Sequence, residues 1–148
     1  MKKVNVLCVG KIKESYLREG IEEYSRRISR FARLEFTELK DFPSPDEVRC
    51  ESDELLGRMS GFNILMDIEG VMMSSEQLSR TLDEAYCRFS SVTFVIGGSA
   101  GVDERVRRRA DIRLSFGKIT FPHQLMRLVL CEQIYRVFSI TEGLPYHK

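Results

Sequence analysis

Two glycine-containing loops in the last third of the chain have the residue types best suited to holding a ligand. The apolar run Val92 to Ile96 leads directly into Gly97-Gly98-Ser99-Ala100-Gly101, and a second loop spans Gly117 to Pro122. A glycine pair after a buried strand lets the backbone approach a bulky group without a Cβ in the way. We expect the two loops to face each other across a cleft that suits an adenine edge and a ribose. The spacing equally allows the glycines to serve only a tight turn.

The common nucleotide and metal motifs are missing. No G-x-G-x-x-G follows the first strand, which ends in the lone Gly10, and no G-x-x-x-x-G-K-[ST] is present. The four cysteines lie far apart without a C-x-x-C pair, and the chain has only two histidines, His123 and His147. These observations argue against a standard dehydrogenase, a P-loop NTPase and a metal site.

Length and composition indicate one soluble globular domain, residues 1–148. The chain is 43% hydrophobic and 30% charged, with a formal net charge of +1. A nucleic-acid partner would therefore have to bind a local basic patch, because the whole molecule offers no long-range attraction. No apolar run approaches the roughly 18 residues of a membrane span, and the start is too short for a secretory signal. We expect a cytoplasmic protein with no membrane partner.

The periodicity alternates strands with helices, which predicts an α/β fold with a mostly parallel sheet flanked by helices. Asp46 and either Ser74 or Ser75 are expected to cap helices, and Gly70 to close the third strand. The second helix is expected to bury Val48, Leu55, Leu56 and Met59. The expected strands are Val4 to Val9, Leu34 to Leu39, Ile64 to Ile68, Val92 to Ile96 and Ile112 to Phe116, and the expected helices cover 17–31, 46–59, 75–89, 102–110 and 124–140.

The last helix carries more apolar surface than a helix resting on one sheet needs. Apolar side chains between Met126 and Phe138 cover half of its circumference or more. A second copy of the chain is the economical cover, which predicts a homodimer. Arg127 projects into this apolar arc, so it needs a carboxylate or carbonyl partner, which a dimer interface could supply. Its place near the helix start equally allows it to extend into solvent.

Three segments carry a family resemblance that runs over essentially the whole chain. "IGGSAGVDERV" followed by "LSFGKITFPHQLMRLVLCEQIYRVFSITEGLPYHK", together with the start "VGKIKESYLREGIEEYSRRISRF", resembles the SPOUT-class ribosomal RNA large subunit methyltransferase H family. That family methylates N3 of a pseudouridine in 23S rRNA. The resemblance implies a trefoil-knotted α/β fold, S-adenosyl-L-methionine bound in the knot, and a homodimer. Composition and periodicity do not indicate a knot.

The resemblance also implies residue roles. The catalytic candidates are the tail residues Tyr146, His147 and Lys148, which would close over the partner's pocket and help N3 lose its proton. Without the resemblance, a disordered terminus would be the more common fate of these residues. The implied cofactor contacts are Met66, Gly98, Gly117, Lys118, Ile119, Thr120, Phe121 and Pro122.

For the RNA, Arg136 on the last helix is the preferred phosphate contact, with arginines 26, 27, 30, 33, 105, 107, 108, 109 and 113 as weaker candidates. The implied substrate is 23S rRNA within the assembled ribosome. Two other functions stay open: methylation of another RNA, such as a tRNA ribose hydroxyl, and a non-catalytic ribosome-binding protein.

Overall fold

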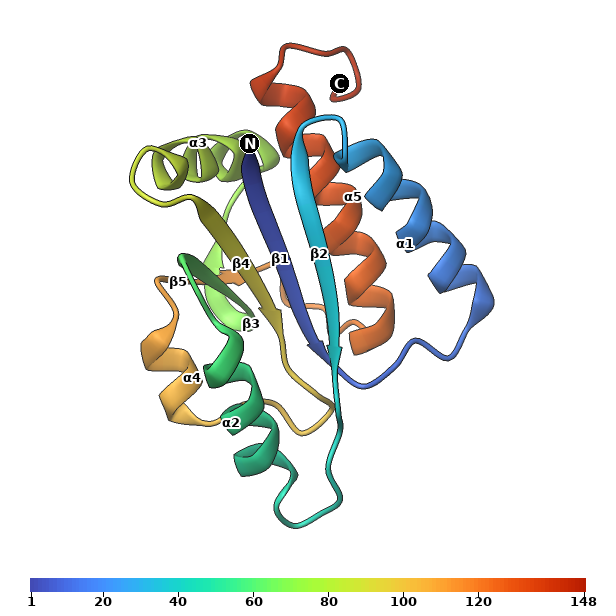
Figure 1. Ribbon diagram of the computed structural model, residues 1–148, viewed down its shortest axis with the longest axis vertical. Helices are drawn as coiled ribbons and strands as arrows, with labels where there is room; N and C mark the ends of the chain where they lie inside the picture. The colour runs from blue at the N-terminus through green and yellow to red at the C-terminus, as the bar shows by residue number, and fades with distance from the viewer.

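Strands and helices alternate along the chain and build a five-stranded parallel sheet (Figure 1). The computed structural model describes residues 1–148. The strand order is β2-β1-β4-β3-β5, so the first strand lies inside the sheet and the last at one edge. The strands are β1 Lys2–Val9, β2 Ala32–Leu39, β3 Phe62–Met72, β4 Ser91–Ile96 and β5 Ile112–Ser115; the helices are α1 Ser15–Ile28, α2 Glu47–Arg58, α3 Ser75–Tyr86, α4 Glu104–Arg109 and α5 His123–Thr141.

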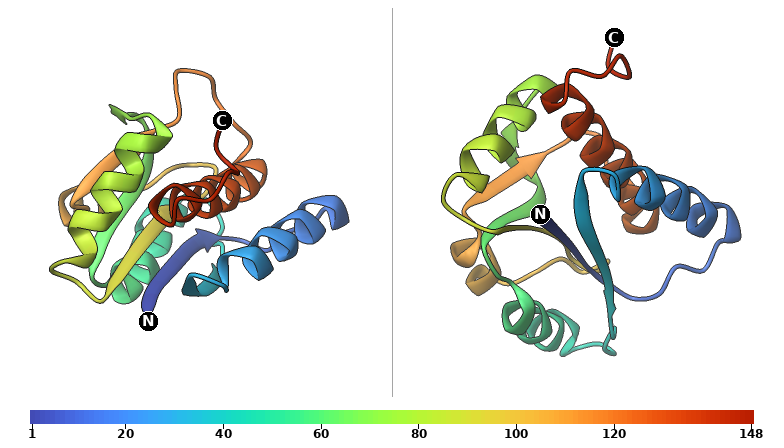
Figure 2. Two further views of the ribbon diagram at one scale, coloured as in Figure 1. Left: turned by 90° about the horizontal axis from the view of Figure 1, so that it is seen from above. Right: turned by 45° about the horizontal axis from the view of Figure 1, so that its top comes forward.

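Helices cover both faces of the sheet, as the predicted α/β fold requires (Figure 2). Along β1 the side chains alternate: Val6 and Cys8 pack into the core shared with α3 and α5, while Leu7 and Val9 pack into the core shared with α2 and α4. Helix α1 lies against α5 on the first face. Every strand thus places its carboxyl end at one edge of the sheet, where the predicted ligand loops begin.

The sequence predicted that the third strand ends before Gly70, and this prediction was wrong. The strand continues to Met72, and both Met66 and Val71 lie opposite Leu114 of β5, so the residues between them form an irregularity in the ladder. A Cβ on Gly70 would lie 2.4 Å from the carbonyl oxygen of Arg113. Glycine is therefore needed there for close contact between strands, not for a turn.

The helix starts follow the sequence in one case and differ in another. Ser74 forms a capping box with Gln77: its hydroxyl accepts from the Gln77 N–H at 3.1 Å, and the Gln77 side chain accepts from the Ser74 N–H at 2.8 Å. Asp46 occupies the expected N-cap position of α2, but its side chain makes no capping hydrogen bond.

The α2 helix also buries different residues from those predicted. Leu55 and Met59 are buried as expected, but the other buried positions are the polar Glu51 and Ser52. A buried carboxylate is costly unless it has hydrogen-bond donors. The burial of Glu51 therefore indicates that this face of α2 makes polar contacts, which the apolar pattern did not predict.

The apolar surface of α5 is covered within the same chain. Leu130, Ile134 and Phe138 are buried, and α5 lies between α1 and α3 over the sheet (Figure 1). The need for a second copy to cover this helix, inferred from the sequence, was therefore wrong. The homodimer itself stays a prediction.

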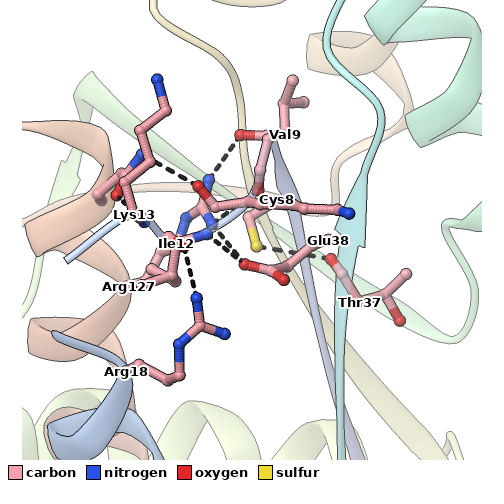
Figure 3. A network of polar contacts seen from close by, with 11 residues as sticks. Cys8, Val9, Ile12, Lys13, Arg18, Thr37, Glu38 and Arg127 are labelled. Atoms are coloured by element: carbon pink, nitrogen blue, oxygen red, sulfur yellow. Dashed lines mark hydrogen bonds and ion pairs between the residues drawn. The ribbon is translucent and has the colours of Figure 1, made fainter. Parts of the chain in front are cut away.

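Arg127 is fully buried, and both terminal nitrogens of its guanidinium have partners in its own chain (Figure 3). Its guanidinium donates to the carbonyls of Val9 at 2.5 Å and Gly10 at 2.8 Å and pairs with Glu38 at 3.3 Å. The expected carboxylate and carbonyl partners are thus confirmed. They do not lie across a dimer interface, and Arg127 does not extend into solvent.

None of the helices is long and apolar enough to cross a membrane. No group of three or more histidine, cysteine or acidic side chains is placed to hold a metal ion.

Candidate functional site

A cavity of about 270 Å³ opens at the carboxyl ends of β4 and β5 and beside the middle of β3, where the irregularity of that strand begins. The glycine loop after β4 contributes Gly97, Gly98 and Gly101, and the loop after β5 contributes residues from Gly117 to Phe121. The prediction that these two loops face each other across one cleft is confirmed. Apolar side chains complete the wall: Leu65, Met66, Ile68, Ile96, Val102, Leu114, Phe116 and Met126.

Three side chains that can carry charge also line this cavity. Asp67, at the irregularity in β3, pairs with Arg113 at 3.4 Å, and Arg107 of α4 pairs with Glu104 at 3.5 Å. His123 is the first residue of α5; burial lowers its pKa below the ordinary value of 6.5, and the nearby Arg127 guanidinium lowers it further. The imidazole is therefore neutral at pH 7. The cavity thus offers an apolar wall, backbone polar groups, one anion and one cation.

Sequence reasoning missed these three residues. Their signal was positional: Asp67 lies near the end of the third strand expected from the sequence, Ile64 to Ile68, and His123 follows directly after the second loop. Arg107 was named only as one of several arginines facing RNA.

Six of the eight predicted cofactor residues are brought together. Met66, Gly98, Gly117, Ile119, Thr120 and Phe121 all line the cavity. Lys118 is exposed and Pro122 occupies the position before α5; neither lines the wall. The structure thus gathers most of the predicted set at one place.

Packing within the protein explains why position 98 is a glycine, and the sequence did not reveal this. A Cβ on this residue would lie 2.6 Å from Oε1 of Glu51 and 3.3 Å from Val9 Cγ1. Glu51 is only 4% exposed, and its other oxygen accepts from the Phe42 N–H at 3.0 Å. The neighbouring Ser52 accepts from the Asp103 N–H at 3.0 Å. The buried polar face of α2 thus supports the glycine loop from behind.

The C-terminal tail packs on α5, away from the cavity. The Tyr146 ring meets Tyr135 edge-on at 4.6 Å between centroids, its hydroxyl donates to Glu132 at 2.8 Å, and the Arg136 guanidinium lies 4.9 Å from its ring centre. His147 lies within 2.9 Å of Arg136 through Nδ1 and within 3.1 Å of Glu76 through Nε2. Lys148 is exposed. The tail is therefore held in place and not a free end.

No tail side chain lines the cavity of its own chain. Arg136, which contacts the tail, and Met126, which lines the cavity, are ten residues apart on α5. At about 1.5 Å per residue this places them about 15 Å apart along the helix axis. Burial and the hydrogen bonds to Tyr24 and Glu132 raise the pKa of Tyr146, so its hydroxyl stays protonated at neutral pH.

The arginines predicted to face RNA are mostly paired with carboxylates. Arg26 and Arg27 share Glu23, Arg105 contacts Asp53 and Asp103, and Arg136 pairs with Glu132 at 2.6 Å. The predicted basic patches are thus largely neutralised in this structure.

The family model described as "Predicted SPOUT methyltransferase" matches residues 2–147. The chain belongs to this SPOUT methyltransferase family. Curated relatives named "Ribosomal RNA large subunit methyltransferase H", from Streptococcus pneumoniae strains CGSP14 and 70585, are each 48% identical over 158 aligned positions, covering 99% of this chain and 99% of the relative.

A solved structure, the SpoU methyltransferase AviRb from Streptomyces viridochromogenes in complex with the cofactor AdoMet, aligns with 89% of this chain and 56% of its own length. That alignment has 13% identity and a TM-score of 0.44. Membership in the SPOUT family accords with the observed parallel α/β sheet. The trefoil knot expected for a SPOUT protein stays a prediction.

Proposed function

We propose that this protein uses S-adenosyl-L-methionine to methylate N3 of a pseudouridine in 23S rRNA, acting as a cytoplasmic homodimer on the assembled ribosome. The observation that carries the proposal is the cavity between the two loops, in a chain that is 48% identical to rRNA large subunit methyltransferases over its whole length. Its apolar wall and backbone groups suit an adenosine, and its charged groups suit an amino-acid chain.

The cavity residues fit such a cofactor by chemical type. Leu65, Ile96 and Leu114 can surround adenine, and the backbone of the loop from Gly117 to Phe121 can hydrogen-bond its edge. Arg107 supplies a cation for the carboxylate of the methionine part, and Asp67 supplies an anion for its ammonium. When bound, the cofactor supplies an already activated methyl group, so the protein chiefly aligns the reactants and excludes water.

The tail residues are proposed to act on the base. The imide N3 must lose its proton, and the charge left on the ring needs stabilisation. The His147 imidazole is the candidate proton acceptor, and the Lys148 ammonium and Arg136 guanidinium are candidates for the anion and a nearby phosphate. Tyr146 is protonated at neutral pH and can act only as a donor or a packing residue.

The separation of tail and cavity supports a dimer. Because the tail is fixed on α5 about 15 Å from the cavity-lining residues of its own chain, it would meet a cavity only in a second copy. The two sites of a dimer would then each contain residues from both chains.

One experiment tests the reaction. Ribosomes and tRNA from cells lacking this protein are incubated with labelled S-adenosyl-L-methionine and the purified protein, and the modified nucleoside is located by mass spectrometry. Label on N3 of a 23S pseudouridine is the expected result, whereas label on a tRNA ribose would assign the other RNA. If calorimetry shows no binding of S-adenosyl-L-methionine, only the non-catalytic ribosome-binding role is left.

A further inference from the structure

The four-residue loop between Gly10 and Lys13, called here the β1 loop, is held more firmly than a surface loop needs to be. Gly10 turns the chain with φ 87°, and its N–H donates to the Leu39 carbonyl at 2.7 Å. The Ile12 N–H donates to Glu38 at 2.7 Å, and the Ile12 carbonyl accepts from Arg18 at 2.7 Å. Ile12 itself is 6% exposed and packs against α1.

The start of α5 fixes the same loop from the other side. Arg127, with no exposed surface, donates to the Gly10 carbonyl and pairs with Glu38, so one buried cation joins the loop to β2 (Figure 3). The Gln124 side chain accepts from the Lys13 N–H at 3.1 Å and donates to the Lys11 carbonyl at 3.2 Å. The loop's backbone is therefore rigidly placed by side chains of three elements.

This rigid loop presents two lysines that the rest of the molecule does not use. Lys11 and Lys13 are exposed, and neither forms an ion pair. Most of the arginines that the sequence suggested for RNA binding are, in contrast, paired with carboxylates. In Figure 3 the Lys13 side chain extends away from Arg127 and Glu38. Gln124 binds the carbonyl of Lys11 and the N–H of Lys13, whereas the two ammonium groups are left for an outside partner.

The β1 loop also lies beside the cavity. Gln124, which binds it, directly follows His123 of the cavity wall. We propose that Lys11 and Lys13 form a preorganised site for backbone phosphates of the RNA substrate, next to the nucleotide being methylated. This inference rests on the proposed function and adds to it a contact between two lysines and the RNA substrate. Two ammonium groups on a fixed loop bind adjacent phosphates without first losing backbone freedom, and such contacts position the RNA without reading its sequence.

The test compares two variants that each remove two positive charges. Lys11→Gln with Lys13→Gln removes the proposed site. Arg58→Gln with Arg88→Gln is the control, because both arginines are exposed, form no ion pair and lie shortly before β3 and β4, at the opposite edge of the sheet. Since the loop is held through lysine backbone atoms, the lysine variant is expected to keep the wild-type melting temperature. Lys11→Arg with Lys13→Arg serves as the rescue.

Binding to large ribosomal subunits from cells lacking the protein is measured at several salt concentrations, with calorimetry of S-adenosyl-L-methionine alongside. We expect the glutamine pair at the β1 loop to lower ribosome affinity about tenfold, and to reduce the slope of log K against log salt by roughly 0.7 to 0.9 per lysine. The arginine rescue restores both quantities, and cofactor affinity stays at the wild-type value.

A β1-loop variant with wild-type affinity and slope, or a control pair that weakens binding equally, overturns the proposal. Failure of the proposed function has a different signature, because wild-type protein would then bind no S-adenosyl-L-methionine or leave ribosomes unlabelled. The binding measurement on ribosomes does not depend on methyl transfer and still decides the role of the two lysines.

Discussion

The carboxylate of Glu51 fills the space in front of Gly98 where a side chain would otherwise stand, with Oε1 2.6 Å from an ideal Cβ. Gly98 has no positive φ, so backbone strain does not require glycine there. The sequence suggested that this glycine allows a cofactor to approach. The structure shows that a buried side chain of α2 also approaches this glycine, which lines the cavity as well.

This contact predicts a compensating pair of substitutions. Gly98→Ala alone forces its new methyl group into Glu51 and is expected to cost about 1 to 3 kcal/mol of stability and to weaken S-adenosyl-L-methionine binding. In a Glu51→Ala background the contact at 2.6 Å is gone and only the milder one with Val9 Cγ1 at 3.3 Å is left, so Gly98→Ala should have much less further effect. Calorimetric affinities of the four proteins check this. An equal loss in both backgrounds would mean that the cofactor, and not Glu51, requires the glycine.

Arg127 is predicted to be a major contributor to stability. Arg127→Met leaves Glu38 without its cation and the carbonyls of Val9 and Gly10 without their donor, so we expect a loss of about 3 kcal/mol in the free energy of unfolding. Arg109→Met, at an exposed arginine without an ion pair, should stay within about 0.5 kcal/mol. Urea titrations measure both, and a similar loss in the two variants would contradict the assigned role.

Deletion of Tyr146 to Lys148 is predicted to separate binding from chemistry. The truncated protein should bind S-adenosyl-L-methionine as the wild type does, because no tail side chain lines the cavity of its own chain, while methyl transfer to ribosomes is abolished. Light scattering should still report a dimer. Full turnover by the truncated enzyme would show that the tail takes no part in the reaction.

Cofactor binding is predicted to weaken at acid pH through His123. The pKa of this imidazole lies below 6.5 because burial disfavours its charged form, so it is neutral from pH 7 to 8 and affinity should be constant there. As the pH falls through the lowered pKa, a cation forms in the wall that receives a sulfonium, and affinity falls. His123→Asn should flatten the calorimetric profile, whereas His147→Asn should leave it as in the wild type.

The sequence predicted the parts of this fold that depend on periodicity and on glycine chemistry. The strand and helix order and the facing of the two loops follow from apolar patterns and from the common edge of parallel strands. The cofactor set, with Gly117 and Phe121 in the wall, came largely from the family resemblance.

Long-range polar contacts could not be predicted in the same way. Glu51 was not among the residues expected to be buried in α2, and nothing local shows that it faces a loop 47 positions further along the chain. Arg127 likewise finds carbonyls that only the folded sheet brings to it. The role of Lys11 and Lys13 emerges only when the backbone bonds of their loop are known, because sequence alone does not distinguish a fixed lysine from a mobile one.

The bonds from Arg127 to Val9 and Gly10 join residues 118 and 117 positions apart. The interior strand β1 is synthesised before α5, yet the carbonyls of Val9 and Gly10 receive their donor only when that helix is present. A nascent chain that lacks α5 therefore leaves part of one face of the sheet exposed, and it cannot form the hydrogen bonds from Arg127 to Val9 and Gly10. Contacts of such sequence separation belong to slowly folding topologies, so the protein acquires its native structure after the whole chain has been made rather than piece by piece from its N-terminus.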